Sequence, residues 1–283
     1  MMAHGLLAPR VRPARLVLLG HPVGHSLSPR IQNAALARAG IDARYEALDV
    51  EPADFEPTLE LLRAERAAGN VTVPHKERMF AACDVLTPLA QHVGAVNTFW
   101  FDERGRLAGD NTDVGGFAAS VRSLAGRVPK DMSVGVLGAG GAAAAVLAAV
   151  ESWPGCDAHV YNRTPERARL LCERFGSIAR PVDDVGAIAG AQLVVNATTI
   201  GLHDDLLPID LSLLPSDSMV VDLVYRPDET AFVREARRRG HRAIDGLVML
   251  VEQAALAFEQ WFGVSPDRRV MAEAAASGRS PAP

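Results

Sequence analysis

The stretch that most constrains the fold is residues 134–145, VGVLGAGGAAAA. Residues 134–137 are typical of a short buried strand, residues 138–141 of a tight turn, and the following alanines favour a helix. In such a unit the missing Cβ atoms let a pyrophosphate approach the backbone, and the first helical N–H groups point at it. GAGGAA departs from a full GxGxxG, so an ordinary tight turn is the alternative interpretation. The expected dinucleotide contacts are Gly138, Ala139, Gly140, Gly141 and Ala142.

The strand expected next, residues 158–161, ends in Asn162, Arg163 and Thr164. A fold of this kind that binds NAD usually carries an acidic residue there for the ribose 2′-hydroxyl, whereas arginine suits a 2′-phosphate. Arg167, one helical turn further on, is a possible second clamp, because a guanidinium matches phosphate oxygens as a fork. A solvated arginine at a strand end is the alternative. Placed after the glycine turn, these residues predict NADP rather than NAD.

Composition narrows the class of protein. A chain of 283 residues that is 48% hydrophobic can bury a sizeable core and suggests one or two domains. Its net charge of −5 gives no electrostatic footprint for nucleic acid. Three cysteines without metal-ligand spacing predict a reducing compartment and no metal site. Because no apolar run is long enough to span a membrane and the first fifteen residues lack a signal peptide's apolar region, we expect a cytoplasmic protein with a loose N-terminal tail.

Lysine is rare in this chain: only Lys76 and Lys130 stand among 29 basic residues. Lys76 follows a short expected strand that Pro74 stops, so Asn70, Thr72 and Lys76 fall at or just after a strand's end, on the ligand side of an open α/β sheet. Unlike arginine, lysine transfers a proton when burial lowers its pKa. A solvated residue at a helix start is the alternative, and the helix dipole disfavours it.

The loop at residues 20–29, GHPVGHSLSP, carries two serines between a strand and an amphipathic helix. Ser28 is placed to be the helix N-cap, with Pro29 at the first helical position. That role leaves Ser26 unexplained, since its hydroxyl would lie on the loop at the carboxyl end of the strand. Two hydroxyls there suit a polyhydroxylated or carboxylate ligand.

Three further polar residues are candidates for contact with a ligand. Gln253 stands among apolar neighbours, and a buried glutamine needs hydrogen-bond partners, which a ligand can supply. Asp113, which ends the polar turn GDNTD, fits an N-cap as well as a ligand contact. Thr198 belongs to NATTIG, residues 196–201, a loop at a strand end that we expect to face the cofactor.

Strands and helices alternate along the chain, which predicts two α/β domains. In the first half we expect strands at 15–19, 45–50, 69–73, 94–100 and 106–108, and helices at 30–39, 54–67, 76–83, 87–91 and 114–124. In the second half we expect strands at 134–137, 158–161, 177–180, 193–196, 219–224 and 242–244. The helices expected there are 165–175, 182–189, a basic helix ending at 239, a long apolar helix at 246–262 and a short one past 269.

Nine blocks in this order resemble the shikimate dehydrogenase family. They are GHPVGHSLSP, GNVTVPHK, GAVNT, GDNTDVGGF, GAGGAA, NRT, NATTIG, DLVYRP and GLVMLVEQAALAFEQWFG, and they cover nearly all of residues 15–263. The resemblance implies reversible, NADPH-dependent reduction of 3-dehydroshikimate to shikimate in aromatic amino-acid biosynthesis. It also implies two α/β domains with the active site in the cleft between them. We expect a substrate-binding domain at 1–113 plus 246–283 and a Rossmann-type NADP-binding domain at 114–245.

The resemblance also implies roles for individual side chains. Ser26 and Ser28, helped by Tyr225, would bind the substrate carboxylate. Lys76 and Asp113 would form the catalytic pair: an ammonium near the carbonyl oxygen stabilises the developing alkoxide and supplies a proton, and a carboxylate holds it and helps relay the proton. Which of the two donates the proton stays open. The residues that would surround the ring hydroxyls are Thr72, Lys76, Asn97, Asp113 and Gln253. Those that would complete the cofactor site are Thr198, Gly246 and Met249.

Two positions depart from the family pattern, and three other functions compete. Gln32 stands where the family often has histidine, and we expect it to affect helix packing only. Ala144 replaces a frequent arginine or other polar residue, which removes a possible cofactor contact.

A quinate/shikimate dehydrogenase using NAD or NADP is the nearest alternative. A non-catalytic NADP-binding sensor is a second alternative, but the presence of both Lys76 and Asp113 argues against it. A methylenetetrahydrofolate dehydrogenase is a third alternative, and the sequence blocks SLSP and GDNTD argue against that one. A monomer and a homodimer both fit the sequence.

Overall fold

The computed structural model describes residue 13 and residues 15–277, and this part of the chain divides into two compact units. The first unit holds the chain up to Thr112 and again from Val251, and the second runs from Asp113 to Leu250. Each unit is built on its own six-stranded sheet, so the predicted α/β class is confirmed. Most of the expected N-terminal tail, and the chain end beyond the last described helix, lie outside the described residues.

The sheet of the first unit has the strand order β2-β1-β3-β5-β6-β4. Its strands are β1 (Arg15–Gly20), β2 (Arg44–Asp49), β3 (Ala68–Val71), β4 (Val85–Leu86), β5 (Thr98–Phe101) and β6 (Leu107–Asp110). Only β5 runs antiparallel to the other five, and its hairpin with β6 pairs Thr98 with Asp110. The amino end of β5 therefore lies at the edge where β1, β3 and β6 have their carboxyl ends.

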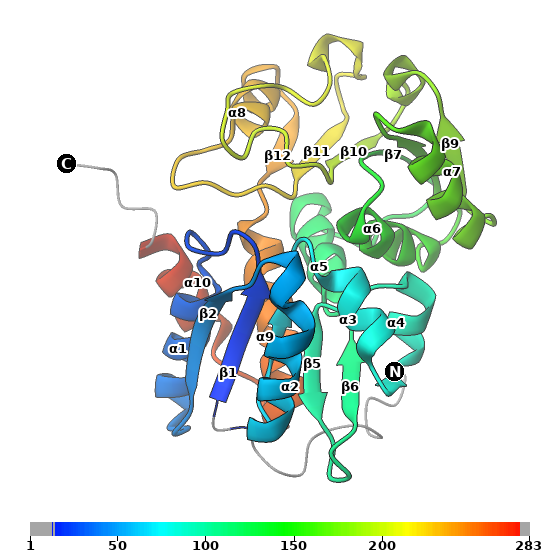
Figure 1. Ribbon diagram of the computed structural model, residues 1–283. Coiled ribbons are helices and arrows are strands. Elements are labelled where there is room, and N and C mark those ends of the chain that lie inside the picture. Colours follow the sequence, from blue (N-terminus) through cyan, green and yellow to red (C-terminus); the bar gives the residue numbers. More distant parts are fainter. Residues whose placement is uncertain (1–12, 14, 278–283) are drawn as a thin grey trace. The chain divides into compact units, whose positions relative to one another are not determined.

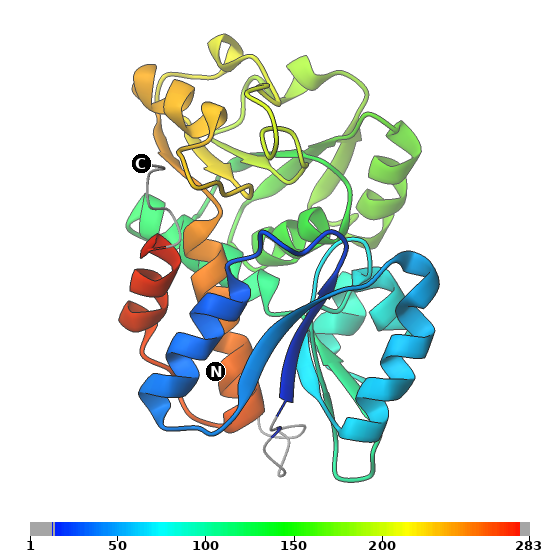
Figure 2. The ribbon, with the colours of Figure 1, turned by 60° about the vertical axis from the view of Figure 1, so that its left-hand side comes forward.

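Helices cover both faces of this sheet, with α2 on one face and α1, α9 and α10 on the other (Figures 1 and 2). They are α1 (Ser28–Ala39), the 3₁₀ turn η1 (Pro52–Asp54), α2 (Phe55–Glu65), α3 (Lys76–Ala82), α4 (Pro88–Val93), α9 (Leu247–Phe262) and α10 (Arg268–Ser277). Gln32 joins α1 to α9, because its Nε2 donates to the carbonyl of Ala254 at 3.0 Å. This departure from the family pattern thus lies in a helix contact.

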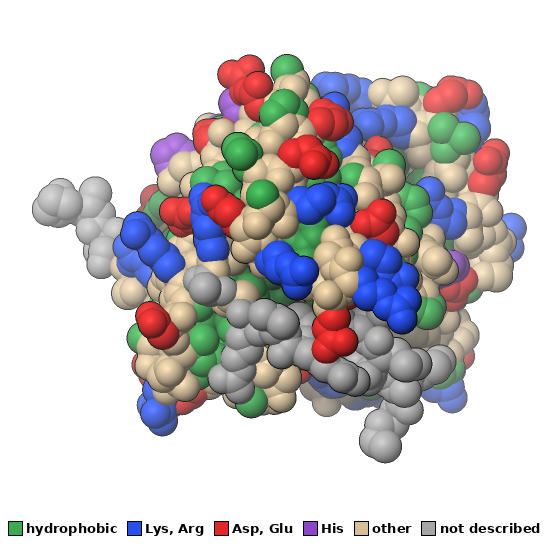
Figure 3. All heavy atoms as spheres, turned by 60° about the horizontal axis from the view of Figure 1, so that its bottom comes forward, with side chains coloured by type: hydrophobic (Ala, Val, Ile, Leu, Met, Phe, Trp, Pro, Cys, Tyr) green, Lys and Arg blue, Asp and Glu red, His purple; other side chains and the backbone are tan. Residues whose placement is uncertain are grey.

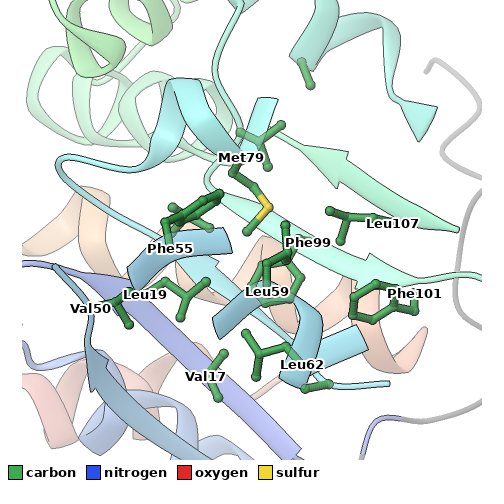
Figure 4. Packing of buried hydrophobic residues seen from close by; sticks show 14 residues of the cluster. Val17, Leu19, Val50, Phe55, Leu59, Leu62, Met79, Phe99, Phe101 and Leu107 are labelled. Carbon is green, nitrogen blue, oxygen red and sulfur yellow. The ribbon is translucent and has the colours of Figure 1, made fainter. Parts of the chain in front are cut away.

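The core of the first unit follows from the alternation of side chains along β1. Val17 and Leu19 share one face of the sheet with Phe55, Leu59 and Leu62 of α2, and all five side chains are buried (Figure 4). Burying a side chain of this size contributes about 1.5–3 kcal/mol. The packing between α2 and β1 holds the sheet whose edge carries the candidate substrate residues.

The sheet of the second unit is wholly parallel, in the order β12-β11-β10-β7-β8-β9. Its strands are β7 (Ser133–Leu137), β8 (Asp157–Tyr161), β9 (Ala179–Val182), β10 (Leu193–Asn196), β11 (Met219–Asp222) and β12 (Arg242–Ile244). Its helices are α5 (Asp113–Ala125), α6 (Gly141–Glu151), α7 (Pro165–Arg174), the 3₁₀ turns η2 (Val185–Ile188) and η3 (Leu211–Leu213), and α8 (Ala231–Arg238). The chain moves outward from β7 to β9 and then returns to the other side of β7. The carboxyl ends of β7 and β10 thus form a topological switch point, where open α/β sheets bind ligands.

Three expected elements differ from the structure, and one strand was not expected. The strand expected at 94–100 begins only at Thr98, because Gly94, with φ of +69°, ends α4 and the next residues form a connection. The expected strand at 177–180 is β9, two residues later, and the expected helix at 182–189 is only the 3₁₀ turn η2. There the Asp184 carboxylate accepts from the N–H of Gly186 at 2.9 Å, which favours a short turn. The two-residue strand β4 was missed, since it is too short to show a period.

Candidate active site

The candidate substrate residues of the first unit come from segments that meet at one edge of its sheet. Ser26 and Ser28 follow β1, Thr72 and Lys76 follow β3, and Asn97 directly precedes β5. Because β5 is antiparallel, its amino end lies beside the carboxyl ends of the other strands. The reversed strand therefore brings Asn97 to the same edge as the other four residues.

The two loops that carry Ser26 and Thr72 are bound to each other. The N–H of Thr72 donates to the carbonyl of Leu19 at 2.8 Å, and the N–H of His21 donates to the carbonyl of Val73 at 3.0 Å. A Cβ at Gly20 would lie 2.3 Å from Cγ2 of Thr72, which is closer than two such atoms approach. The place of Thr72 thus depends on the glycine that ends the neighbouring strand β1.

The expectation that Ser28 caps α1 was wrong. The helix begins at Ser28, so Leu27 is the N-cap residue, and no side chain caps the helix. The hydroxyl of Ser26 accepts from the N–H of Ser28 at 3.2 Å. Ser26 is half-buried, and Ser28 is only 6% exposed.

Lys76 is the first residue of α3, as expected, and its backbone is held from two sides. Its carbonyl accepts from the N–H of Val96 at 3.0 Å, next to Asn97 in the chain. The preceding His75 is fully buried, where its Nε2 donates to the carbonyl of Val50 at 2.6 Å and its ring stacks on Phe55. The start of α3 is therefore anchored in the core while the Lys76 side chain is half-buried.

Asn97 connects the remaining candidates of this edge. Its Oδ1 accepts from the N–H of Thr112 at 2.7 Å, and its Nδ2 donates to Oε1 of Gln253 at 3.4 Å. Thr112 directly precedes Asp113, the first residue of α5, which is 5% exposed. Asn97 therefore fixes both Gln253 and the segment that leads into Asp113.

Asn70 has a structural role that its position in the sequence did not indicate. Its Nδ2 donates to the carbonyl of Asn97 at 3.1 Å and to Oγ1 of Thr98 at 3.0 Å, and its Oδ1 accepts from the hydroxyl of Tyr45 at 2.8 Å. These hydrogen bonds connect Asn97 and its neighbour Thr98 to β3 and β2.

The glycine turn of the second unit lies at the switch point between β7 and β10. Gly138 has φ of +112°, and a Cβ there would lie 2.8 Å from the carbonyl oxygen of Ala197. Its N–H donates to the carbonyl of Tyr161 at 2.8 Å, which ties the turn to the end of β8. Only glycine satisfies both the backbone angle and the close approach.

The N-terminus of α6 fits a pyrophosphate group. Gly140 is its N-cap residue, no side chain caps the helix, and its first turn contains no acidic residue. A Cβ at Gly140 would meet no atom of the described residues within 4 Å, so the space beside the turn is open. Uncapped N–H groups at the positive end of a helix favour an anion. Ala144 is buried within α6.

The loop after β8 fits a 2′-phosphate. Nδ2 of Asn162 donates to the carbonyl of Thr164 at 2.9 Å and closes the turn that precedes α7. Arg163 and Arg167 are both exposed. Among the residues that the structure describes, neither guanidinium has an ion-pair partner.

The remaining cofactor candidates lie at the same edge of this sheet. Oγ1 of Thr198 donates to Oδ1 of Asn196 at 2.6 Å, just after β10. The N–H of Gly246 donates to the carbonyl of Val224 at 3.0 Å, which joins the start of α9 to the segment after β11. Met249 is buried, and Tyr225 is half-buried.

The described residues contain no group of His, Cys, Asp and Glu side chains that could hold a metal ion. In the same part of the chain, no helix is both long and apolar enough to cross a membrane. On the face shown in Figure 3, Lys and Arg side chains alternate with Asp and Glu side chains.

A glycine turn at the switch point of a parallel sheet defines the class of dinucleotide-binding α/β proteins. Residues 18–99 match the family model of the shikimate dehydrogenase substrate binding domain, and residues 246–276 match that of the shikimate 5'-dehydrogenase C-terminal domain. The chain is 44% identical to the shikimate dehydrogenase (NADP(+)) of Mesorhizobium japonicum over 87% of this chain and 90% of that protein. The chain belongs to the shikimate dehydrogenase family.

Solved structures agree with this assignment. Shikimate 5-dehydrogenase from Thermus thermophilus in complex with NADP(H) and shikimate has a TM-score of 0.84 and 43% identity, and the match covers 93% of this chain and 99% of that one. Quinate dehydrogenase from Corynebacterium glutamicum in complex with NAD also has a TM-score of 0.84, at 29% identity over 93% of this chain and 98% of that one. The fold alone therefore does not separate the two substrates.

Proposed function

We propose that this protein is an NADP-dependent oxidoreductase that reversibly reduces 3-dehydroshikimate to shikimate. The observation that carries the proposal is the edge of the first sheet, where Asn97 binds Gln253 and the residue before Asp113, beside the start of α3 at Lys76. The 43% identical relative from Thermus thermophilus binds NADP(H) and shikimate. As part of the same proposal we expect a cytoplasmic protein, for which the three free cysteines are support.

The first unit would bind the substrate through hydroxyl and amide groups. Ser26, in the loop after β1, and Ser28, at the start of α1, would donate to the substrate carboxylate. Tyr225, which belongs to the second unit, would add a third hydroxyl. The side chains that would contact the ring hydroxyls are Thr72, Asn97 and Gln253. Asn97 and Gln253 are held by other protein groups before any substrate binds, so little side-chain entropy is lost on binding.

Lys76 and Asp113 would handle the proton. Bound NADPH supplies a hydride, and negative charge then develops on the carbonyl oxygen of the substrate. The Lys76 ammonium would stabilise that charge and give or relay a proton to the oxygen. The Asp113 carboxylate, nearly inaccessible to water, would orient the ammonium and take part in the relay.

The second unit would hold the cofactor. The open glycine turn and the uncapped helix α6 would bind the pyrophosphate, and Arg163 and Arg167 the 2′-phosphate. The residues that would complete the site are Asn162, Thr164, Thr198, Gly246 and Met249.

An oxidation assay tests the proposed function and separates its nearest alternative. Purified protein is mixed with shikimate or quinate, each with NADP or NAD, and the formation of reduced cofactor is followed by absorbance. We expect rapid reduction only with shikimate and NADP. Comparable rates with quinate or NAD would assign the protein to the quinate-using relatives, and no reduction with any pair would refute the proposal.

Replacing Gly20 by alanine should weaken shikimate binding. The new Cβ would lie 2.3 Å from Cγ2 of Thr72 and 2.6 Å from Cγ1 of Val23, in the loop that carries Ser26, and would displace both side chains. We expect the KM for shikimate to rise about tenfold, as when one oriented hydrogen bond is lost, with the KM for NADP unchanged. Gly24→Ala, in the loop that follows β1, is the control, since a Cβ there meets no described atom within 4 Å. Equal KM values for the two variants would show that Thr72 does not depend on Gly20.

Replacing Arg163 by alanine should narrow the preference for NADP over NAD. The variant loses a charge-assisted contact to the 2′-phosphate. We therefore expect the kcat/KM for NADP divided by the kcat/KM for NAD to fall by about tenfold or more, mainly because the KM for NADP rises. Arg180→Ala, at an exposed arginine of β9, is the control. An unchanged ratio for Arg163→Ala would mean that another residue binds the phosphate.

A further inference from the structure

A fully buried carboxylate ends strand β11. Asp222 is 0% exposed, although the rest of its strand is apolar. Its oxygens accept three hydrogen bonds from neutral donors: Nδ2 of Asn196 at 2.9 Å, the N–H of Val224 at 3.1 Å and the hydroxyl of Thr230 at 2.7 Å. Burying a carboxylate costs free energy that an apolar side chain at the same position would not cost. Its three bonded partners point to a role in holding the loops around it.

One of these partners shapes the loop of Thr198. The Asn196 side chain donates from Nδ2 to the carbonyl of Ile200 at 3.1 Å. Its Oδ1 accepts from the backbone N–H of Thr198 at 3.1 Å and from the Thr198 hydroxyl at 2.6 Å. Asn196 is itself fully buried. Asp222 therefore orients the amide that fixes the conformation of residues 196–200.

A second partner lies beside Tyr225. Asp222 fixes the N–H of Val224, and the Val224 carbonyl accepts from Gly246 at 3.0 Å. The third partner, Thr230, is the N-cap of α8, so the segment from Asp222 to Thr230 is held at both ends by one carboxylate. Tyr225 lies within this segment.

We propose that Asp222 is a positioning residue that holds the cofactor-contacting Thr198 and the substrate-contacting Tyr225 in their binding positions at the same time. This inference rests on the proposed function, because it takes the roles of Thr198 and Tyr225 from there. Asp222 itself would touch neither ligand. It acts through Asn196 on one loop and through Val224 on the other.

The burial of Asp222 disfavours its charged form, and its hydrogen bonds favour that form. Burial raises the pKa of Asp222 above its ordinary value, and the bonds from Thr230, Val224 and Asn196 oppose that rise. Buried polar networks define one arrangement when every member has a partner. Asp222 meets that condition.

The test measures steady-state kinetics of Asp222→Ala and Asp222→Asn in the oxidation of shikimate by NADP. For Asp222→Ala we expect the KM values for shikimate and for NADP both to rise about tenfold, with kcat within about threefold of wild type. Asp222→Asn keeps one acceptor oxygen and should give intermediate KM values. If Asp222→Ala does not fold, Thr230→Val against Thr230→Ser replaces it, and the loss of the hydroxyl should raise both KM values by a smaller factor.

Ser218→Ala is the matched structural control. Ser218 is buried just before β11, at the opposite end of the strand from Asp222, and its hydroxyl donates to the carbonyl of Ala191 at 2.8 Å. It should lower the melting temperature without changing either KM. If Asp222→Ala and its substitutes lower only the melting temperature, or raise only one KM, the inference is wrong.

Tyr225→Phe separates this inference from the proposed function. It should raise the KM for shikimate alone. If wild type oxidises shikimate and Tyr225→Phe behaves in this way while Asp222→Ala leaves both KM values unchanged, the function stands and the inference falls. If wild type does not oxidise shikimate, the proposed function itself has failed, and Asp222 has no such role.

Discussion

Replacing Lys76 by alanine should lower the turnover of shikimate by about a hundredfold or more, the size of effect that general acid–base catalysis contributes. The variant removes the ammonium that would stabilise the developing alkoxide and deliver its proton. NADPH affinity should stay within about twofold, because the expected cofactor contacts all lie in the second unit. Turnover is measured by absorbance, and NADPH affinity by the fluorescence of the bound nucleotide.

The chain offers an unusually clean control for this prediction, because Lys130 is the only other lysine. Lys130 is exposed and forms a 3.6 Å ion pair with Asp131. Lys130→Ala should therefore leave turnover unchanged. Lys76→Arg keeps the positive charge but cannot release a proton near neutral pH, so it should remain almost as slow as Lys76→Ala. Turnover of Lys76→Ala within a few-fold of wild type would rule out the proposed role.

Replacing Asp113 by asparagine should also lower turnover by about a hundredfold, since the amide keeps the shape of the side chain and loses the charge that orients Lys76 and relays its proton. The backbone before it should stay in place, because Asn97 holds Thr112. A fall in kcat with little change in either KM is expected.

Asp110→Asn is the control for this change. Asp110 ends β6, close to Asp113 in the chain, and its Oδ1 accepts from the hydroxyl of Thr87 and the N–H of Asn111, bonds that an amide oxygen can keep. Its activity should stay close to that of wild type. If Asp113→Asn and Asp110→Asn retain the same activity, Asp113 is a structural residue and Lys76 acts without it.

The second unit was largely predictable from the sequence because its signals are local. A strand, a glycine turn and an alanine-rich helix follow one another within residues 134–151, and Gly138 does have a positive φ there. The Arg163 loop also follows directly from the end of a strand. A parallel sheet then places these consecutive units at one edge, so sequence order was enough to group the expected cofactor residues.

The first unit shows where sequence reasoning fails. Nothing in the residues of β5 indicates that it runs antiparallel, because pairing direction depends on segments far apart in the chain. Asn97 was therefore expected inside a strand rather than before one. Asn97 was predicted to contact the substrate only because of the family resemblance. The structure adds its hydrogen bonds to Thr112 and Gln253.

Asp222 was missed as a residue of interest for a related reason. The expected strand at 219–224 continued past Asp222, so the sequence did not indicate that Asp222 ends the strand. Its three hydrogen-bond partners come from positions 196, 224 and 230, and only the folded chain shows that they converge. The early end of the strand follows from the carboxylate accepting from the N–H of Val224.

The reduction of 3-dehydroshikimate by NADPH is the reaction in which the proposed activity can be measured without an intermediate assumption. Wild-type protein is incubated with both compounds, NADPH consumption is followed by absorbance, and the product is identified by chromatography against authentic shikimate. We expect one shikimate formed for each NADPH consumed, and almost none with Lys76→Ala. Consumption of NADPH without shikimate, or no consumption at all by a protein that binds NADPH, would contradict it.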